Sequence, residues 1–293
     1  MSVVSKKKRR FLRAAERAMR VPVIFEDDGP PPVRSTNAWE AEIELAGPAA
    51  YPIIHYQRLK KGEGLYSIDK DNQGSAFFVS MGPLGGVFLT ARHVVETHSD
   101  AKPYSLLILD LAKESFYATR VLKLALHPTL DAAIGAVGLA HPVKEWRVGR
   151  RRLSKGEPFI TFGFPSTRRK EVQTPYGRQL RMNYLPAEVK GFIADFQDDE
   201  PRYGPVYIHE TWVDHGISGG PLVSPYDGRV YALNSRGFRP REAVDEPALE
   251  MALSLDGLLS WSPPLLDGRT LGDFLAEHER RVDERDARAE AGT

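Results

Sequence analysis

The chain is organised around Asp214-His215-Gly216-Ile217-Ser218-Gly219-Gly220-Pro221-Leu222, where one serine stands among glycines ahead of an apolar segment. The pattern is defined by three glycines, one serine and one proline at fixed positions. At ordinary usage of about 5 to 7% for each residue type, it arises by chance in roughly one chain of this length in several thousand. A serine hydroxyl becomes a nucleophile when a base removes its proton and when donors wait for the oxyanion. Gly216 lets the backbone aim the N–H groups of Gly216 and Ser218 into one space, and we expect Gly219 and Gly220 to leave room for a substrate. Ser218 is therefore a candidate nucleophile.

The letters Gly-x-Ser-x-Gly around Ser218 also match the nucleophile elbow of α/β-hydrolases. In that fold the serine opens a helix, and an acid and then a histidine follow it along the chain. Gly219, Gly220 and Pro221 make a poor helix start. The only histidine after Ser218 is His278, which lies in a charged run where we expect a solvated helix face. The opposite order, histidine, aspartate and then serine, fits the chain better.

The candidate partners of Ser218 are His93 and Asp131. His93 follows the apolar run 86–90 and a short turn, so a strand end would hold its backbone while the imidazole faces a cleft. Asp131 has apolar neighbours on both sides, and a buried carboxylate is destabilising without partners. A histidine N–H is a suitable partner, and the same bond would hold the imidazole in the tautomer that accepts the serine proton.

Four segments together carry a family resemblance: Gly74-Ser75-Ala76-Phe77-Phe78-Val79, Thr90-Ala91-Arg92-His93, Asp131-Ala132-Ala133-Ile134 and Gly216-Ile217-Ser218-Gly219-Gly220-Pro221-Leu222. In this order they resemble the trypsin-like (chymotrypsin-fold) serine peptidases of the bacterial type, over about residues 50–262. The resemblance implies an all-β fold of two perpendicular six-stranded antiparallel β-barrels, with the active site between them. It also implies a catalytic triad of His93, Asp131 and Ser218, and an oxyanion hole made by the amides of Gly216 and Ser218.

The resemblance assigns substrate-binding positions as well. Ser235, Arg236 and Gly237 stand where the family pairs with the substrate backbone and lines the primary specificity pocket. By the same register the pocket floor is Trp212, which implies a shallow pocket that favours small apolar side chains. The residue before the serine is Ile217, where digestive members carry an aspartate that pairs with a freshly cut N-terminus. Ile217 cannot pair with an ammonium group, so we expect either a constitutive site or one that a partner orders.

We expect five regions: a basic N-terminal arm with a Pro-rich linker (1–49), a first β-barrel (50–142), a basic connector (143–155), a second β-barrel (156–262), and a C-terminal helix and tail (263–293). The first 20 residues carry eight basic side chains against Glu16 alone, and their apolar runs are too short for a membrane span. The family places its C-terminal helix on the second barrel, and we expect the same here.

Composition sets the remaining limits. The chain has 293 residues, 42% of them hydrophobic, and a formal net charge of +1, so it can bury a sizeable core. It contains no cysteine, which favours a reducing compartment or a bacterial source and predicts a cytoplasmic protein. His93 and His98 lack the spacing of a zinc site, and we expect His209, Glu210 and His215 to be strand or loop residues. No phosphate or dinucleotide motif is present, so no metal or other cofactor is predicted.

Two hypotheses about function follow. The first is a serine endopeptidase that hydrolyses peptide bonds through an acyl-enzyme, acting in the cytoplasm as a processing protease under a regulatory protein partner. The second is a catalytically silent, trypsin-like binding module whose basic segments hold an acidic partner or nucleic acid. Of these partners, nucleic acid is the less favoured.

Overall fold

The computed structural model describes residues 50–58, 66–82, 85–97, 104–110, 115–139, 143–165, 171–174, 177–182, 187–200, 204–211, 213–238 and 249–291. The predictions on the N-terminal arm and linker, on His98 and on Trp212 lie outside these residues.

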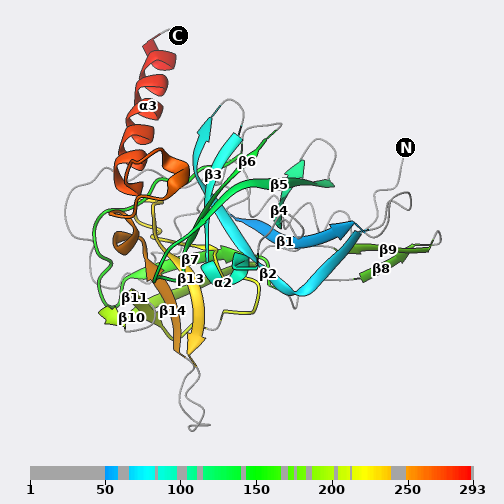
Figure 1. The fold of residues 1–293 in the computed structure, drawn as a ribbon. Coiled ribbons are helices and arrows are strands. Elements are labelled where there is room, and N and C mark those ends of the chain that lie inside the picture. Colours follow the sequence, from blue (N-terminus) through cyan, green and yellow to red (C-terminus); the bar gives the residue numbers. More distant parts are fainter. Residues whose placement is uncertain are drawn as a thin grey trace, which may run out of the picture.

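The first half of the described chain forms a closed antiparallel barrel with the strand order β1-β2-β3-β6-β5-β4 (Figure 1). Its strands are β1 (Tyr51–Arg58), β2 (Tyr66–Gly82), β3 (Gly85–Thr90), β4 (Tyr104–Asp110), β5 (Ser115–Leu126) and β6 (Ala133–Gly138). Phe78 and Phe88 are fully buried and meet edge to face, with ring centroids 6.3 Å apart. A side chain at Gly135 would overlap the Phe88 ring, so this glycine allows the core of the barrel to close.

The second half forms another closed antiparallel barrel, with the order β10-β11-β14-β13-β12-β7. Its strands are β7 (Pro158–Gly163), β10 (Ala187–Glu200), β11 (Gly204–His209), β12 (Pro221–Val223), β13 (Val230–Phe238) and β14 (Leu249–Ser254). A separate two-stranded sheet consists of β8 (Glu171–Thr174) and β9 (Gly177–Met182). Phe159, Tyr207 and Leu222 belong to a buried cluster formed by this barrel and the adjoining connector. The prediction of an all-β chain with two six-stranded antiparallel barrels is confirmed.

The two barrels share a larger hydrophobic core. Phe77 of the first barrel and Leu253 of the second are both fully buried and belong to one continuous cluster. Two short 3-10 helices follow the second barrel, η2 (Leu255–Leu258) and η3 (Pro264–Leu266), and their Leu258 and Leu266 join the same cluster. Because burial of apolar area is the main favourable term in folding, this common cluster fixes the barrels against each other.

The chain ends in the helix α3 (Leu271–Ala291), which is capped by Thr270. The Thr270 hydroxyl accepts a hydrogen bond from the Asp273 N–H at 3.0 Å and donates one to the Asp273 carboxylate at 2.7 Å. Leu271 and Leu275 are buried, whereas the last turns are exposed and extend away from the barrels (Figure 1). Among the helices of the described ranges, none combines the length and the hydrophobicity that spanning a membrane requires.

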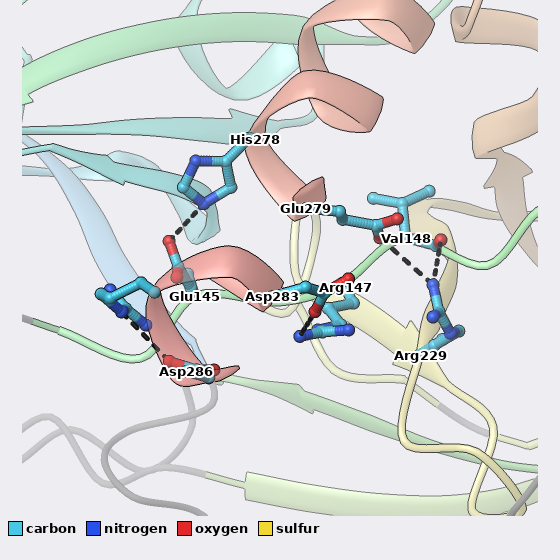
Figure 2. A network of polar contacts seen from close by, with 9 residues as sticks. Glu145, Arg147, Val148, Arg229, His278, Glu279, Asp283 and Asp286 are labelled. Carbon is cyan, nitrogen blue, oxygen red and sulfur yellow. Dashed lines mark hydrogen bonds and ion pairs between the residues drawn. The ribbon is translucent and has the colours of Figure 1, made fainter. Parts of the chain in front are cut away.

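Polar contacts hold α3 against the connector and the second barrel (Figure 2). Arg147 of the connector pairs with Asp283 at 2.6 Å. Arg229, between β12 and β13, pairs with Glu279 at 3.1 Å. The helix also packs on β2 of the first barrel. α3 therefore contacts the second barrel, as expected, and in addition the connector and the first barrel.

His278 corrects one expectation, since it does not lie on a solvated face of α3. Its ring nitrogens are 3.2 Å from Ser80 Oγ of β2 and 2.8 Å from Glu145 Oε2 of the connector. The side chain is only 15% exposed. The charged residues around His278 in the sequence gave no sign of these partners, which are 198 and 133 residues away along the chain.

We predict that His278→Ala lowers the free energy of unfolding by about 1 to 2 kcal/mol, because it leaves the partly buried Glu145 and Ser80 without a partner from the helix. Arg280→Ala, which removes an exposed pair with Glu284, is the matched control in the same helix and should cost under about 0.5 kcal/mol. Urea unfolding of both variants measures the difference. Equal losses in the two variants would show that His278 does not fasten the helix.

Candidate active site

The three predicted catalytic residues come from three connections between strands. His93 lies in the short helix α2 (Arg92–Val95) that follows β3. Asp131 lies in the turn between β5 and β6, and Ser218 lies in the turn between β11 and β12. Arg92 donates hydrogen bonds to the carbonyl groups of His127 and Pro128, at 2.7 and 2.9 Å. These bonds fasten α2 to the turn that carries Asp131.

The structure brings His93 and Asp131 together at two points. His93 Nδ1 is 2.7 Å from Asp131 Oδ2, and the His93 backbone N–H donates to Asp131 Oδ1 at 2.9 Å. The two side chains are 22% and 11% exposed, so both are largely removed from water. Because each carboxylate oxygen has its own donor on His93, the ring is fixed in position and orientation relative to the acid.

Ser235 of β13 adds a third donor to the same carboxylate, from the second barrel. Its hydroxyl is 2.5 Å from Asp131 Oδ2, and the residue is 3% exposed. Burial alone would raise the pKa of Asp131. The hydrogen bonds from the His93 ring and backbone and from Ser235, together with the charge of His93, outweigh burial and hold the pKa below its usual value. Asp131 is therefore an ionised acceptor at neutral pH.

Ser218 Oγ donates to the backbone carbonyl of Ser235 at 3.0 Å. Within the described residues no hydrogen bond joins Ser218 to His93. Rotation about the serine χ1 moves the hydroxyl between staggered positions without a change in the backbone. The backbone itself is fixed to the first barrel, because the Ser75 N–H donates to the Ser218 carbonyl at 2.8 Å.

The turn before Ser218 is the predicted site of the oxyanion hole. Gly216 has φ of 97°, in the left-handed region that glycine adopts readily. The turn is closed by a bond of 3.2 Å from the Ile217 N–H to the Asp214 carbonyl. Across the parts of the chain that the structure describes, no acceptor takes the N–H of Gly216 or of Ser218. Both amides are thus available as donors.

Gly219 and Gly220 have a different role from the one expected of them. A Cβ at Gly219 would overlap the Ser75 carbonyl oxygen, and one at Gly220 would overlap the Phe162 carbonyl oxygen. Both glycines are buried, so they admit neighbouring backbone rather than substrate. The expectation that they make room for a substrate is corrected on this steric ground.

The predicted substrate-binding residues 235–237 lie on β13. Gly237 pairs with Glu250 of β14 beyond an irregularity in the register that follows Asn234. The side chain of Arg236 and the whole of Trp212 lie outside what the structure describes. A shallow pocket for small apolar side chains therefore stays a prediction. The contact of the Ser235 side chain with Asp131 was missed, because the two residues are 104 positions apart and no local pattern connects them.

Two further histidines, His209 and His127, are held by contacts within the fold. His209 ends β11, is fully buried, and lies against the Phe159 ring with centroids 4.7 Å apart. Burial lowers its pKa to about 4, so the ring is neutral at physiological pH. Burial and the nearby Arg92 lower the pKa of His127, which packs on Trp261. Among the residues described, no group of three His, Cys, Asp or Glu side chains is placed to hold a metal ion.

Several of the six basic side chains in the connector (143–155) form ion pairs within the chain. Arg147 pairs with Asp283, Arg151 with Glu157, and Arg152 with Asp198. Aromatic rings take part as well: the guanidinium groups of Arg151 and Arg152 lie over Tyr231 and Phe196, and Lys144 lies over Trp146. Three of the six basic residues are thus paired internally with acids, which weakens the case for a surface that holds an acidic partner.

Comparison with known proteins agrees with this fold. Residues 74–233 match the family model described as trypsin-like peptidase domain. The chain belongs to this family and is a trypsin-like serine peptidase. Among solved structures 523 chains match, and one of them, titled "Crystal structure of Deg5", is 15% identical with a TM-score of 0.50. That match covers 87% of this chain and 93% of the other, and at this identity it shows the shared fold. No curated protein matches the chain.

The lowered pKa of Asp131 predicts how Asp131→Asn changes stability with pH. A carboxylate whose pKa is lower in the folded state stabilises the fold above its unfolded pKa of about 3.9, and this stability is lost as the pH falls through the folded pKa. The difference in free energy of unfolding between wild type and Asp131→Asn should be largest near pH 7 and shrink below about pH 4.

Urea unfolding at a series of pH values measures this difference. Asp195→Asn, at an exposed position of β10, is the control and should show a small difference throughout. A wild-type advantage over Asp131→Asn that is constant from neutral to strongly acidic pH would contradict the assignment.

Proposed function

We propose that this peptidase is a serine endopeptidase that works through a triad of Ser218, His93 and Asp131 and an acyl-enzyme intermediate. The observation that carries the proposal is the two-point hydrogen bonding of His93 by Asp131. It holds the imidazole in one tautomer: with Nδ1–H donated to Oδ2, the lone pair on Nε2 is left to act as the base.

The reaction then runs in two halves. Ser218 Oγ attacks the carbonyl carbon of the scissile bond while its proton passes to His93 Nε2. The carbonyl oxygen becomes an oxyanion that accepts hydrogen bonds from the N–H groups of Gly216 and Ser218. When the intermediate collapses, the C–N bond breaks, and Nε2–H protonates the leaving amine. Water then attacks the carbonyl carbon of the acyl-enzyme while its proton passes to His93 Nε2, and collapse of this intermediate returns the proton to Ser218 Oγ. In both halves the ionised Asp131 stabilises the imidazolium that forms.

We propose that the bond from Ser218 Oγ to the Ser235 carbonyl breaks when a substrate binds. We expect β13 to pair with the substrate backbone as an added strand. A substrate N–H that donates to the Ser235 carbonyl would take the place of Ser218 Oγ there. The hydroxyl would then be released toward His93 when the peptide is in position.

We further propose that the enzyme is a cytoplasmic processing protease that a partner regulates, rather than one switched on by a new N-terminus. Two observations support this. Ile217 is 1% exposed and carries no charge with which an ammonium group could pair. The sequence contains no cysteine, in keeping with a reducing compartment. A silent binding module is less favoured, because the base, the acid and the serine are all of competent types and the connector pairs much of its own charge.

We predict that a fluorophosphonate probe labels the full chain at Ser218 without prior cleavage. Ser218→Ala should abolish labelling, whereas Ser154→Ala, at an exposed serine outside the site, should label like wild type. Mass spectrometry of the labelled peptide identifies the residue. Labelling of the folded wild type at another serine, or labelling only after an N-terminal segment is removed, would contradict the proposal.

We predict that wild-type protein cuts peptides in a proteome-derived library and that Ser218→Ala leaves the same peptides intact. Asp131→Asn should lower kcat about 10⁴-fold, the size of the effect known for this class of triad, because the imidazole is then held in the wrong tautomer. Mass spectrometry of the new termini measures the cuts and also gives the residue preferred before the cut. Identical cleavage by wild type and Ser218→Ala would show that Ser218 is not the nucleophile.

A further inference from the structure

Ser75 of β2 is a buried residue to which the triad mechanism assigns no task. It is fully buried, and four hydrogen bonds outside the strand ladder connect it to other segments. Its N–H donates to the Ser218 carbonyl at 2.8 Å, and its carbonyl accepts from Thr90 Oγ1 at 2.7 Å. Its hydroxyl is 2.7 Å from the Gly216 carbonyl oxygen and 2.9 Å from the Phe164 nitrogen. A single residue of the first barrel thus contacts the nucleophile turn at two points.

The direction of both hydroxyl bonds is determined by their partners. The Phe164 N–H can only donate, and the Gly216 carbonyl can only accept. Ser75 Oγ therefore accepts from Phe164 and donates its one hydrogen to Gly216. Phe164 follows β7, so the hydroxyl joins both barrels to the turn. A Cβ at Gly163 would lie 2.9 Å from Ser75 Oγ, so a glycine there permits this close approach.

The bond from Ser75 Oγ holds the carbonyl of Gly216, the residue of the turn with the weakest backbone conformational preference. That carbonyl lies, along the chain, between the two amides that form the oxyanion hole. Glycine populates many backbone conformations with similar ease, so the φ of 97° at Gly216 is not held by the residue itself. The Ser75 hydroxyl fixes the carbonyl of Gly216, and the Ser75 amide fixes the carbonyl of Ser218. The torsion angles between the two amides are thereby held from the first barrel.

We propose that Ser75 is the positioning residue of the oxyanion hole. Its hydroxyl holds the Gly216 peptide group so that the N–H groups of Gly216 and Ser218 point at the oxyanion that forms during attack. The inference rests on the proposed function, because it assigns Ser75 to the oxyanion hole of that same site. Ser75 acts through the turn and touches no reacting atom, so it is not itself a catalytic residue.

The test compares kcat and KM for Ser75→Ala, Ser75→Thr and wild type on a peptide that the wild type cleaves. Loss of one oxyanion donor lowers kcat by about 10²- to 10³-fold in enzymes of this kind, so Ser75→Ala should lower kcat about 10²-fold. KM should stay within about threefold, because the interaction is made in the transition state. Ser75→Thr keeps a hydroxyl and should recover at least about tenfold of the lost kcat.

The inhibition constant of a peptide aldehyde of the same sequence gives a second measurement. Its adduct with Ser218 carries a tetrahedral oxygen in the oxyanion hole, so its affinity should fall in parallel with kcat/KM in Ser75→Ala. The matched control is Thr119→Val, which removes a hydroxyl that donates to the Gly138 carbonyl, also at 2.7 Å, in the same barrel. Thr119→Val should lower the free energy of unfolding by less than Ser75→Ala, because Thr119 is only partly buried and its hydroxyl makes one such bond, while kcat and aldehyde affinity stay at the wild-type level.

The outcomes separate this inference from the proposed function. If wild type and Ser218→Ala are equally inactive, the proposed function fails. If wild type is active and Ser75→Ala keeps its kcat and its aldehyde affinity, the role of Ser75 is overturned. A loss of kcat in Ser75→Ala with unchanged aldehyde affinity also overturns it. If Ser75→Ala does not fold, Ser75→Cys replaces it, because a thiol is a weaker donor than a hydroxyl. Ser75→Cys should lower kcat and aldehyde affinity, by less than the roughly 10²-fold expected for Ser75→Ala. Wild-type values in Ser75→Cys would reject the proposal.

Discussion

The site depends on satisfying the buried carboxylate of Asp131. An ionised carboxylate removed from water is destabilising unless donors surround it, and this one receives the His93 backbone, the His93 ring and the Ser235 hydroxyl. The donors come from α2 in the first barrel and β13 in the second. Both barrels are thus needed to supply donors to the Asp131 carboxylate. Its hydrogen bonds stabilise the fold and orient the base at the same time.

Two closed barrels are well suited to hold such a site. A closed sheet has no free edge, and each of these barrels has a buried core, so the connections between strands start and end at fixed points. The three candidate catalytic residues all lie on such connections. Cross-barrel hydrogen bonds then set the relative position of the connections, with Ser235 on Asp131 and Ser75 on the Ser218 turn. Rigid scaffolds and short turns together give the precision that proton transfer requires.

The parts of this arrangement that the sequence predicts are the local ones. His93, Asp131 and Ser218 each stand in a short pattern that the chemistry demands, and the family resemblance carried by such patterns implies the barrels. The contacts that hold the site in place are long-range. Ser75 meets Gly216 across 141 residues, and His278 meets Ser80 across 198. No spacing rule connects such pairs, because their proximity follows from barrel closure and not from the chain between them.

The same distinction applies to the glycines near Ser218. Glycine at 216 is required by a positive φ, which a local pattern can predict. Glycine at 219 and 220 is required by the carbonyl groups of Ser75 and Phe162, which come from other strands. The turn therefore has the shape seen in the structure only when β2 and β7 are in place around it. Because partners in both barrels hold the turn, the proposed oxyanion hole would form only with the whole fold, and the isolated motif would not have it.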